Sequence, residues 1–359
     1  MNRLPRILLG QLGSFGDCLY ATAIARQIKE DYSGCHLTWA IGSPYRSVLT
    51  LNPHVDEVWE IAFRDRREMD AAWRMFERQA QRRYRSGEFD QMFLTQLGPN
   101  NYQNFDGTIR SSLFRSYPHP ITVPVDPVVR LSDDEVDSVR RFAEHHRLAQ
   151  FRHVVLFEYS AESKQSFVNQ EFALRCARGI LARLPDAAFI LSSSQPIASD
   201  DPRIIDGSTL SFRENAELTK HCSLLVGCSS GVSWLCTSDW ARPLPMIQLL
   251  KSYSSVFASM AHDAAYFGRS KETILEMTDC TIDRLVECLS TVLTNGFPQA
   301  RQMFHEEIPV KLDMYFEVFM LSVLKQGQPL KALRSMRHVY RRYGIQPFKD
   351  YWHDIFASV

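Results

Sequence analysis

The amino-acid sequence predicts an α/β protein in which two doubly wound parallel sheets are followed by a helical carboxyl-terminal segment. Three observations lead to this prediction. The chain has 359 residues, 45% of them hydrophobic, which suffices for two domains with a core each. Strand and helix patterns alternate from the first residues, and the alternation starts afresh near residue 150. From about residue 283 only helical patterns remain. We therefore expect Rossmann-like domains at 1–150 and 151–295 and a helical extension at 296–359.

The first domain is expected to open with a strand, a glycine loop and a helix. Ile7, Leu8 and Leu9 form a short apolar run that ends at Gly10, and apolar residues then recur at helical spacing over 19–28. The further elements expected are a strand at 36–41, a short helix at 47–51, a strand at 57–61, an arginine-rich helix at 64–86 and a strand at 91–97. This alternation is typical of a parallel sheet with helices on both faces.

The pattern is interrupted twice before the second domain, which is expected from residue 151. These are a polar loop at 98–104 and four prolines between 117 and 127. Ser132 and Glu135 form a capping box that predicts a helix reaching about His146. The elements expected after it are a strand at 153–158, a helix at 169–184, a strand at 187–192, a helix at 214–220 and a strand at 222–227.

Composition indicates which partners and which cellular compartment to expect. The 41 Lys and Arg residues balance 41 Asp and Glu, so a nucleic-acid partner, which requires excess basic charge, is not expected. No apolar run reaches the length of a signal peptide core or a membrane span. The eight cysteines show neither a Cys-x-x-Cys pair nor metal-ligand spacing, so we expect reduced, mostly buried thiols and no metal. The chain is expected to be cytoplasmic.

The loop between the first strand and the first helix is the first candidate site. It contains Gly10, Gly13, Ser14 and Gly16 and ends at Asp17. In a doubly wound domain this loop lies at the carboxyl edge of the sheet, where ligands bind, and glycines let a ligand approach the backbone. Dinucleotide binding would need an acidic residue near the end of the second strand, and residues 37–43 contain none.

Asp17 has a structural and a functional interpretation. As a helix-capping or first-turn acid it would be stabilised by the helix dipole. As a general base it would accept a proton in a cleft between the domains. The dipole and the nearby N–H groups are expected to favour its ionised form in either case.

Three segments at the amino end resemble one enzyme family. Residues 7–17 read Ile-Leu-Leu-Gly-Gln-Leu-Gly-Ser-Phe-Gly-Asp, residues 21–25 read Ala-Thr-Ala-Ile-Ala, and residues 51–58 read Leu-Asn-Pro-His-Val-Asp-Glu-Val. They resemble the opening of the ADP-heptose transferases of glycosyltransferase family nine. The resemblance implies the GT-B fold, two Rossmann-like domains facing a cleft, and it implies that Asp17 is the catalytic base.

The resemblance continues less cleanly in the second half. Residues 163–167, Ser-Lys-Gln-Ser-Phe, resemble the family's Lys-x-Trp segment, which implies that Lys164 contacts the donor phosphates. Residues 224–235 stand where the family has a strand followed by Asp-Ser/Thr-Gly-x-x-His-Leu, but Ser229 replaces Asp and Trp234 replaces His. Small residues opening a helix can form a nest of N–H groups for a diphosphate, or simply a serine-capped helix start. The donor-binding residues expected in this region are Ser229, Ser230, Gly231 and Ser233.

The loop at 98–119 matches no family segment that we recognise. It follows a strand of the first domain, so it is expected at the edge where GT-B enzymes hold the acceptor, although a solvated loop is the alternative. The polar residues expected to contact an acceptor are Asn100, Asn101, Tyr102, Asp106 and Arg110.

Together these features predict an inverting, metal-independent glycosyltransferase without a cofactor. Its donor would be a nucleotide-diphosphate sugar, with ADP-heptose favoured, and its acceptor a hydroxyl of a glycan, a lipopolysaccharide-type lipid or a protein. The absence of an Asp-x-Asp motif agrees with metal independence. A GT-B sugar-nucleotide epimerase and a non-catalytic GT-B-like binding protein are the alternatives.

Basic residues also concentrate in two segments. Residues 64–86 contain eight Arg against four acids. Between Lys325 and Lys349 there is no acid, and the seven basic residues are Lys325, Lys331, Arg334, Arg337, Arg341, Arg342 and Lys349. Each segment could be a solvated face or could dock on an anionic membrane, which would place the protein at the inner face of the membrane.

Overall fold

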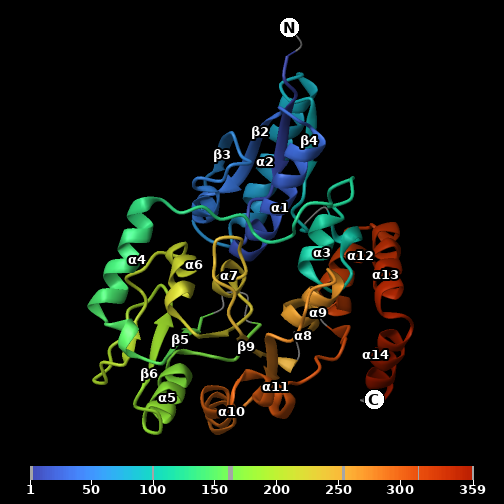
Figure 1. The fold of residues 1–359 in the computed structure, drawn as a ribbon. Helices are drawn as coiled ribbons and strands as arrows, with labels where there is room; N and C mark the ends of the chain where they lie inside the picture. Colours follow the sequence, from blue (N-terminus) through green and yellow to red (C-terminus); the bar gives the residue numbers. More distant parts are fainter. Residues whose placement is uncertain (1–2, 99–100, 161–164, 253–254, 314, 358–359) are drawn as a thin grey trace. The chain divides into compact units, whose positions relative to one another are not determined.

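The structure, a computed structural model, describes residues 3–98, 101–160, 165–252, 255–313 and 315–357 (Figure 1). The chain divides into two compact units. Unit 1 comprises Met1–Arg130 together with Val310–Val359, and unit 2 comprises Leu131–Pro309. This division lies earlier in the chain than the boundary expected near residue 150, and the carboxyl-terminal extension belongs to unit 1.

Unit 1 contains a four-stranded parallel sheet in the order β3-β2-β1-β4. Its strands are β1 (Arg6–Gly10), β2 (His36–Gly42), β3 (Glu57–Ile61) and β4 (Gln91–Leu94). Its α-helices are α1 (Phe15–Asp31), α2 (Met69–Arg85), α3 (Ile109–Phe114), α12 (Leu321–Lys325), α13 (Pro329–Tyr343) and α14 (Gln346–Ala357). Shorter turns are the 3₁₀-helices η1 (Ser43–Leu49) and η2 (Tyr102–Asn104) and the π-helix η6 (Tyr315–Met320).

Apolar burial explains how unit 1 assembles. The central strand β1 is buried over Ile7, Leu8 and Leu9, as expected for a parallel strand covered on both faces. Helix α2 packs Trp73 and Phe76 against the sheet while its other face carries arginines. A Cβ atom at Gly10 would lie 2.6 Å from Leu94 and 2.9 Å from Phe76. Gly10 is therefore required by the close packing of β1, β4 and α2.

Unit 2 contains a six-stranded parallel sheet in the order β10-β9-β8-β5-β6-β7. Its strands are β5 (His153–Glu158), β6 (Ala187–Ser192), β7 (Ile204–Asp206), β8 (Leu224–Gly227), β9 (Met246–Leu250) and β10 (Ile274–Thr278). Its α-helices are α4 (Asp133–His145), α5 (Gln170–Leu181), α6 (Glu214–Leu218), α7 (Gly231–Leu235), α8 (Ser255–Ala258), α9 (Met260–Tyr266), α10 (Ile282–Asn295) and α11 (Phe297–Phe304). Its 3₁₀-helices are η3 (Leu148–Gln150) and η4 (Thr219–His221).

Helix α4 belongs to unit 2 because it packs there. Its predicted capping box is present, since Ser132 N donates to Glu135 at 2.9 Å and Glu135 N donates to Ser132 Oγ at 3.3 Å. The Glu135 carboxylate also forms an ion pair with Arg213, which lies just before α6, at 2.7 Å. The helix that the sequence placed at the end of the first domain is thus joined to the second sheet.

The predicted α/β class with two parallel sheets is confirmed. The strands expected at 57–61, 153–158 and 187–192 have the predicted bounds. Strands β7, β9 and β10 were not predicted. Strand β7 has only three residues, and β9 is a five-residue segment, apolar except for Gln248, whose length and pattern do not separate a strand from part of a helix. The helix expected from residue 64 starts at Met69, because Glu68 binds the backbone and guanidinium of Arg64 in a preceding turn.

The carboxyl-terminal helices are joined to unit 1 through a buried charge cluster. The Asp106 carboxylate, 1% exposed, lies 2.6 Å from Arg115 and 2.8 Å from Arg342 of α13. Burial alone would raise the pKa of Asp106, but the two guanidinium groups outweigh burial and hold it below its ordinary value. Ser335 of α13 also donates to the carbonyl of Phe105 at 2.5 Å. The extension is therefore part of unit 1.

The structure also shows the state of the cysteines and the lengths of the helices. All eight cysteines are free and buried, as expected from their spacing. Among the residues that the structure describes, no helix combines the length and the apolar character needed to cross a bilayer.

Candidate functional site

The strand order defines one switch point in each sheet. In unit 1 the chain proceeds from β1 through β2 to β3 on one side and then places β4 on the other side of β1. In unit 2 the same reversal occurs between β5 and β8. Ligands of open α/β sheets bind outside the carboxyl ends of the strands at such points. The loops after β1, β4, β5 and β8 are therefore the candidate ligand-binding loops.

Gln96 organises the switch point of unit 1. Its side-chain oxygen accepts hydrogen bonds from Leu12 N at 3.0 Å, from Gly13 N at 3.3 Å and from the Gln11 amide at 3.0 Å. The loop after β4 thus fixes the glycine loop after β1. Sequence reasoning missed Gln96, although its position at the end of a predicted strand was a usable signal.

Asp17 lies in the first turn of α1, three residues after the N-cap residue Ser14. Its carboxylate is half-buried and accepts a long hydrogen bond of 3.3 Å from Ser14 N. Burial raises the pKa of Asp17 from 3.8 to about 6, opposed by the Ser14 N–H group and by the charge of Arg66. The expectation that the helix start would favour the ionised form is wrong, because loss of solvation outweighs the dipole and the hydrogen bond.

Gly13 allows close packing within this loop. A Cβ atom at Gly13 would lie 2.4 Å from the Tyr45 ring, so Gly13 lets Tyr45 of η1 pack against the loop. Gly16 is the second residue of α1 and lies beside Asp17. The expected approach of a ligand to the backbone at Gly13 stays a prediction, and Tyr45 occupies the space on the Cβ side of this residue.

The expected acceptor residues separate into two groups. Asn101 and Tyr102 lie at the switch point: Asn101 donates to the carbonyls of Leu94 and Gln96 at 2.6 and 2.8 Å, and Tyr102 begins η2. Burial and the nearby Asp70 raise the pKa of Tyr102. Asn100 lies outside the described residues.

Asp106 and Arg110 have other roles. Asp106 is enclosed in the cluster with Arg115 and Arg342. Arg110 is 3% exposed, donates to the carbonyl of Val125 at 3.0 Å and packs over the Tyr20 ring. Their expected contact with an acceptor is not supported, because both side chains are buried against their own unit.

At the switch point of unit 2, a glutamate of the chain itself occupies the start of α7. The Glu158 carboxylate, at the end of β5, accepts hydrogen bonds from Cys228 N and Val232 N, each at 3.1 Å. Ser230 and Ser233 donate their hydroxyls to the same carboxylate. Ser230 and Ser233, two of the residues expected to contact a diphosphate, therefore bind an internal carboxylate, and Gly231 is the first residue of α7. Glu158 is the charged last residue of the strand predicted at 153–158, after four apolar residues, and sequence reasoning missed this signal.

Ser229 is also held within unit 2. It adopts a left-handed conformation (φ 49°), its N–H donates to Gln248 at 2.7 Å, and its hydroxyl donates to the carbonyl of Ala258. Trp234, which stands where the resembling family has a histidine, is 5% exposed and packs in the interior. Lys164 lies outside the described residues. Gln165, the next residue, donates to the carbonyl of Ser229 at 2.9 Å and so brings this segment to the switch point.

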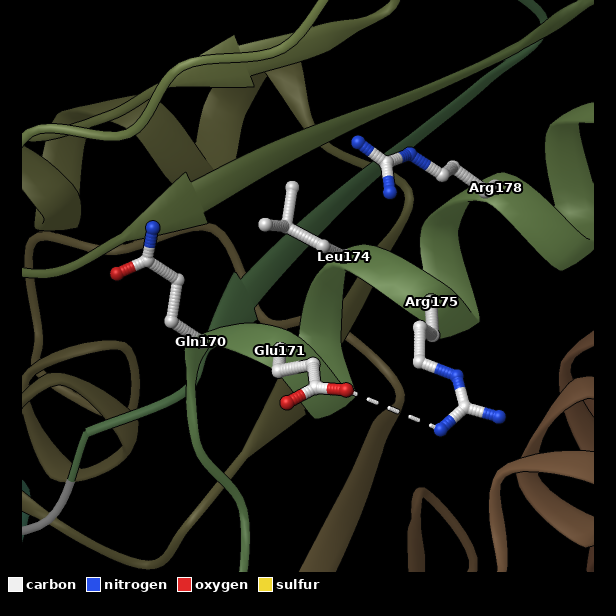
Figure 2. A pocket seen from close by; sticks show the side chains of 5 residues that line it. All are labelled: Gln170, Glu171, Leu174, Arg175 and Arg178. Atoms are coloured by element: carbon white, nitrogen blue, oxygen red, sulfur yellow. Dashed lines mark ion pairs between the residues drawn. The ribbon is translucent and has the colours of Figure 1, made fainter.

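A hollow of about 460 Å³ lies elsewhere in unit 2, along the outer side of α5 (Figure 2). It is lined by Gln170, Glu171, Leu174, Arg175 and Arg178 of this single helix, and Glu171 pairs with Arg175 at 4.0 Å. None of the residues expected from the sequence lines it.

Comparison with known proteins gives structural matches only. No protein-family model and no curated protein matches the sequence. A glycosyl transferase of family 9 from Veillonella parvula DSM 2008 is 12% identical, with 82% of this chain and 99% of that chain covered and a TM-score of 0.57. The ADP-heptose LPS heptosyltransferase II of E. coli is 13% identical, with 81% and 99% covered and a TM-score of 0.51. At such identities the likeness establishes the fold, and the GT-B fold expected from the sequence is confirmed.

Proposed function

We propose that this chain, which has the GT-B fold, is an inverting, metal-independent glycosyltransferase. Its donor is a nucleotide-diphosphate sugar, and ADP-heptose is favoured because the E. coli protein of similar fold is an ADP-heptose heptosyltransferase. Its acceptor is a hydroxyl group of a glycan, of a lipopolysaccharide-type lipid or of a protein. A GT-B fold alone does not define an activity, so the proposal depends on the site.

The observation that carries the proposal is Asp17. It lies at the switch point of unit 1, half-buried, with its pKa raised to about 6. The only hydrogen bond to its carboxylate from the described residues is the long one from Ser14 N. A carboxylate with few partners and a pKa close to neutral is well suited to accept a proton.

In the proposed reaction Asp17 takes the proton of the acceptor hydroxyl. The hydroxyl oxygen forms a bond to the anomeric carbon of the donor from the side opposite the diphosphate. The bond between that carbon and the diphosphate oxygen breaks, and the diphosphate leaves with the electron pair. This single displacement inverts the anomeric centre, and the proton remains on Asp17 until solvent removes it.

The raised pKa of Asp17 predicts the pH dependence. Asp17 must be ionised to act as a base, so kcat/KM should be constant above about pH 6 and fall by about tenfold for each pH unit below it. Measuring the initial rate of sugar transfer between about pH 4.5 and about pH 8, in steps of about half a pH unit, would test this. If kcat/KM did not fall as the pH is lowered through about 6, the assignment of Asp17 as the base would be contradicted.

The donor phosphates are assigned to Lys164 in this proposal, because Ser230 and Ser233 already bind Glu158. Lys164→Ala should weaken binding of the nucleoside diphosphate by about 10- to 150-fold, the scale of a charged hydrogen bond. Titration calorimetry of the two proteins with ADP measures this difference. Lys271→Ala is the matched control: Lys271 lies before β10, at the amino edge of the same sheet, and should leave ADP affinity unchanged. Equal affinities for parent and Lys164→Ala would reject the assignment.

One observation favours a second candidate, a non-catalytic GT-B-like binding protein. Glu158 fills the N–H nest at the start of α7 that a diphosphate would otherwise occupy. Incubation of the protein with ADP-heptose and other nucleotide sugars separates the candidates. Transfer or slow hydrolysis supports the transferase. Raised thermal stability without turnover supports the binding protein, and an isomerised sugar would reject both.

A further inference from the structure

Helix α13 is fixed to unit 1 by one face. Ala332, Ser335 and Val339 are buried, at the spacing of one helical stripe. Ser335 forms hydrogen bonds with Phe105 and with Tyr315, and Arg342 reaches the buried Asp106. This face is therefore fully used inside unit 1, and Arg342 does not belong to the exposed basic set that the sequence indicated.

The opposite face of α13 carries two kinds of exposed side chain. Leu330, Leu333 and Tyr340 are 71%, 58% and 55% exposed. Arg334, Arg337 and Arg341 are also exposed and form no ion pair with the described residues. Their spacing places all six on the side away from the buried stripe. We call these six residues the outer face of α13.

The surroundings of the outer face have the same character. Of the fourteen large hydrophobic side chains that are exposed in the described part of the chain, eight lie between Leu321 and Phe356, including Leu324 and Trp352. No acid occurs between Lys325 and Lys349, although Asp350 and Asp354 follow in α14. Such a concentration of exposed apolar groups marks an interaction surface.

We propose that the outer face of α13 docks on the surface of an anionic phospholipid bilayer. Leucine and tyrosine side chains can enter the boundary between headgroups and acyl chains while the helix lies in the plane of the interface. Arginines on the same face pair with lipid phosphates and extend their charged ends toward the headgroups. The helix would lie on the bilayer, with its buried stripe still packed in unit 1.

Charge favours this occupant over a second copy of the chain. In a twofold-symmetric dimer the same patch faces itself, so three arginines would oppose three arginines. No acid of α13 is available to relieve that repulsion. An anionic surface attracts the same three charges.

The test is co-sedimentation of the full chain with vesicles of phosphatidylcholine alone or of phosphatidylcholine with phosphatidylglycerol, without donor or acceptor. Arg334→Gln/Arg337→Gln/Arg341→Gln should weaken binding to the anionic vesicles by about 100-fold, from roughly fivefold for each charge near the surface. Leu330→Ser/Leu333→Ser should also weaken binding, because apolar insertion is lost. All five substituted side chains are exposed, so an unchanged melting temperature shows that each variant is folded.

The matched control is α2, the other arginine-rich helix of unit 1. Its exposed residues Arg74, Met75 and Arg78 allow the variant Arg74→Gln/Met75→Ser/Arg78→Gln, which should bind like the parent. Equal binding to neutral and anionic vesicles would overturn the proposal. So would loss of binding in the α2 variant but not in the α13 variants, or full binding by Leu330→Ser/Leu333→Ser. A parent dimer that becomes monomeric only in the α13 variants would assign the face to a second copy instead.

Discussion

Asp17→Asn should lose most transfer activity and, at neutral pH, make the folded chain more stable. Asparagine has nearly the same size and can still accept the hydrogen bond from Ser14 N, but it cannot take a proton. General-base assistance contributes about 10²–10⁴-fold, so the single-turnover rate should fall by that factor. Affinity for the donor should stay within about threefold, because the side chain acts on the acceptor.

The stability change follows from the sign of the pKa shift. The pKa of Asp17 is raised on folding, from 3.8 to about 6. The folded state therefore disfavours the ionised form, and the stability present below pH 4 is lost as the pH rises through 6. The loss is at most about 3 kcal/mol, for a shift of about two pKa units at a half-buried group. Asparagine avoids this loss.

Melting temperatures at pH 4 and pH 8 test this account together with the rate. The mutant should be more stable than the parent at pH 8, and the difference should shrink at pH 4. A purely structural capping role predicts normal activity, since asparagine caps helices about as well as aspartate. A well-folded mutant with a normal rate would remove Asp17 from the mechanism.

Asp106→Ala should cause the largest loss of stability in unit 1. It would leave Arg115 and Arg342 without their shared carboxylate, and Arg342 is only 10% exposed. Breaking a buried ion pair by removing one partner costs about 3–5 kcal/mol. The hydroxyls of Ser111 and Ser112, each 3.0 Å from the carboxylate, would lose a partner as well.

The expected local result is release of the carboxyl-terminal helices. Hydrogen exchange over α13 should become faster in Asp106→Ala, and the first transition in chemical denaturation should move to lower denaturant. Because the pKa of Asp106 is held below its ordinary value, its contribution is complete at neutral pH and is lost as the pH falls below about 4. Glu60→Ala, which removes an exposed pair with Arg46, is the control and should change neither measurement. Unchanged exchange over α13 would contradict the role of the cluster.

The buried Glu158 at the switch point of unit 2 affects how the segment at 224–235 is interpreted. The sequence places Ser229 where the resembling family has an aspartate, which suggests the loss of a carboxylate at this turn. Glu158 supplies a carboxylate there from a different strand, through Ser230, Ser233 and two backbone N–H groups. The carboxylate that meets the start of α7 thus comes from a strand that lies about 70 residues earlier in the chain.

Local patterns determined the fold class and part of the secondary structure. The bounds of β3, β5 and β6 and the capping box at Ser132 follow from runs of strand formers and from a four-residue signal. These features depend on residues that lie close together in the chain, so the sequence alone is sufficient to predict them. The glycine loop and Asp17 could be placed at a sheet edge for the same reason, since the loop joins the first strand to the first helix.

Only the tertiary structure decided what surrounds those residues. The raised pKa of Asp17 depends on burial, Tyr45 occupies the space beside Gly13, and Glu158 occupies the start of α7. The pairing of Asp106 with Arg342 joins residues 236 positions apart. Such contacts arise when strands and helices pack, and no periodicity in the sequence records which distant side chain will fill a given space. The chemistry of a site therefore depends on packing even where its position along the chain is evident.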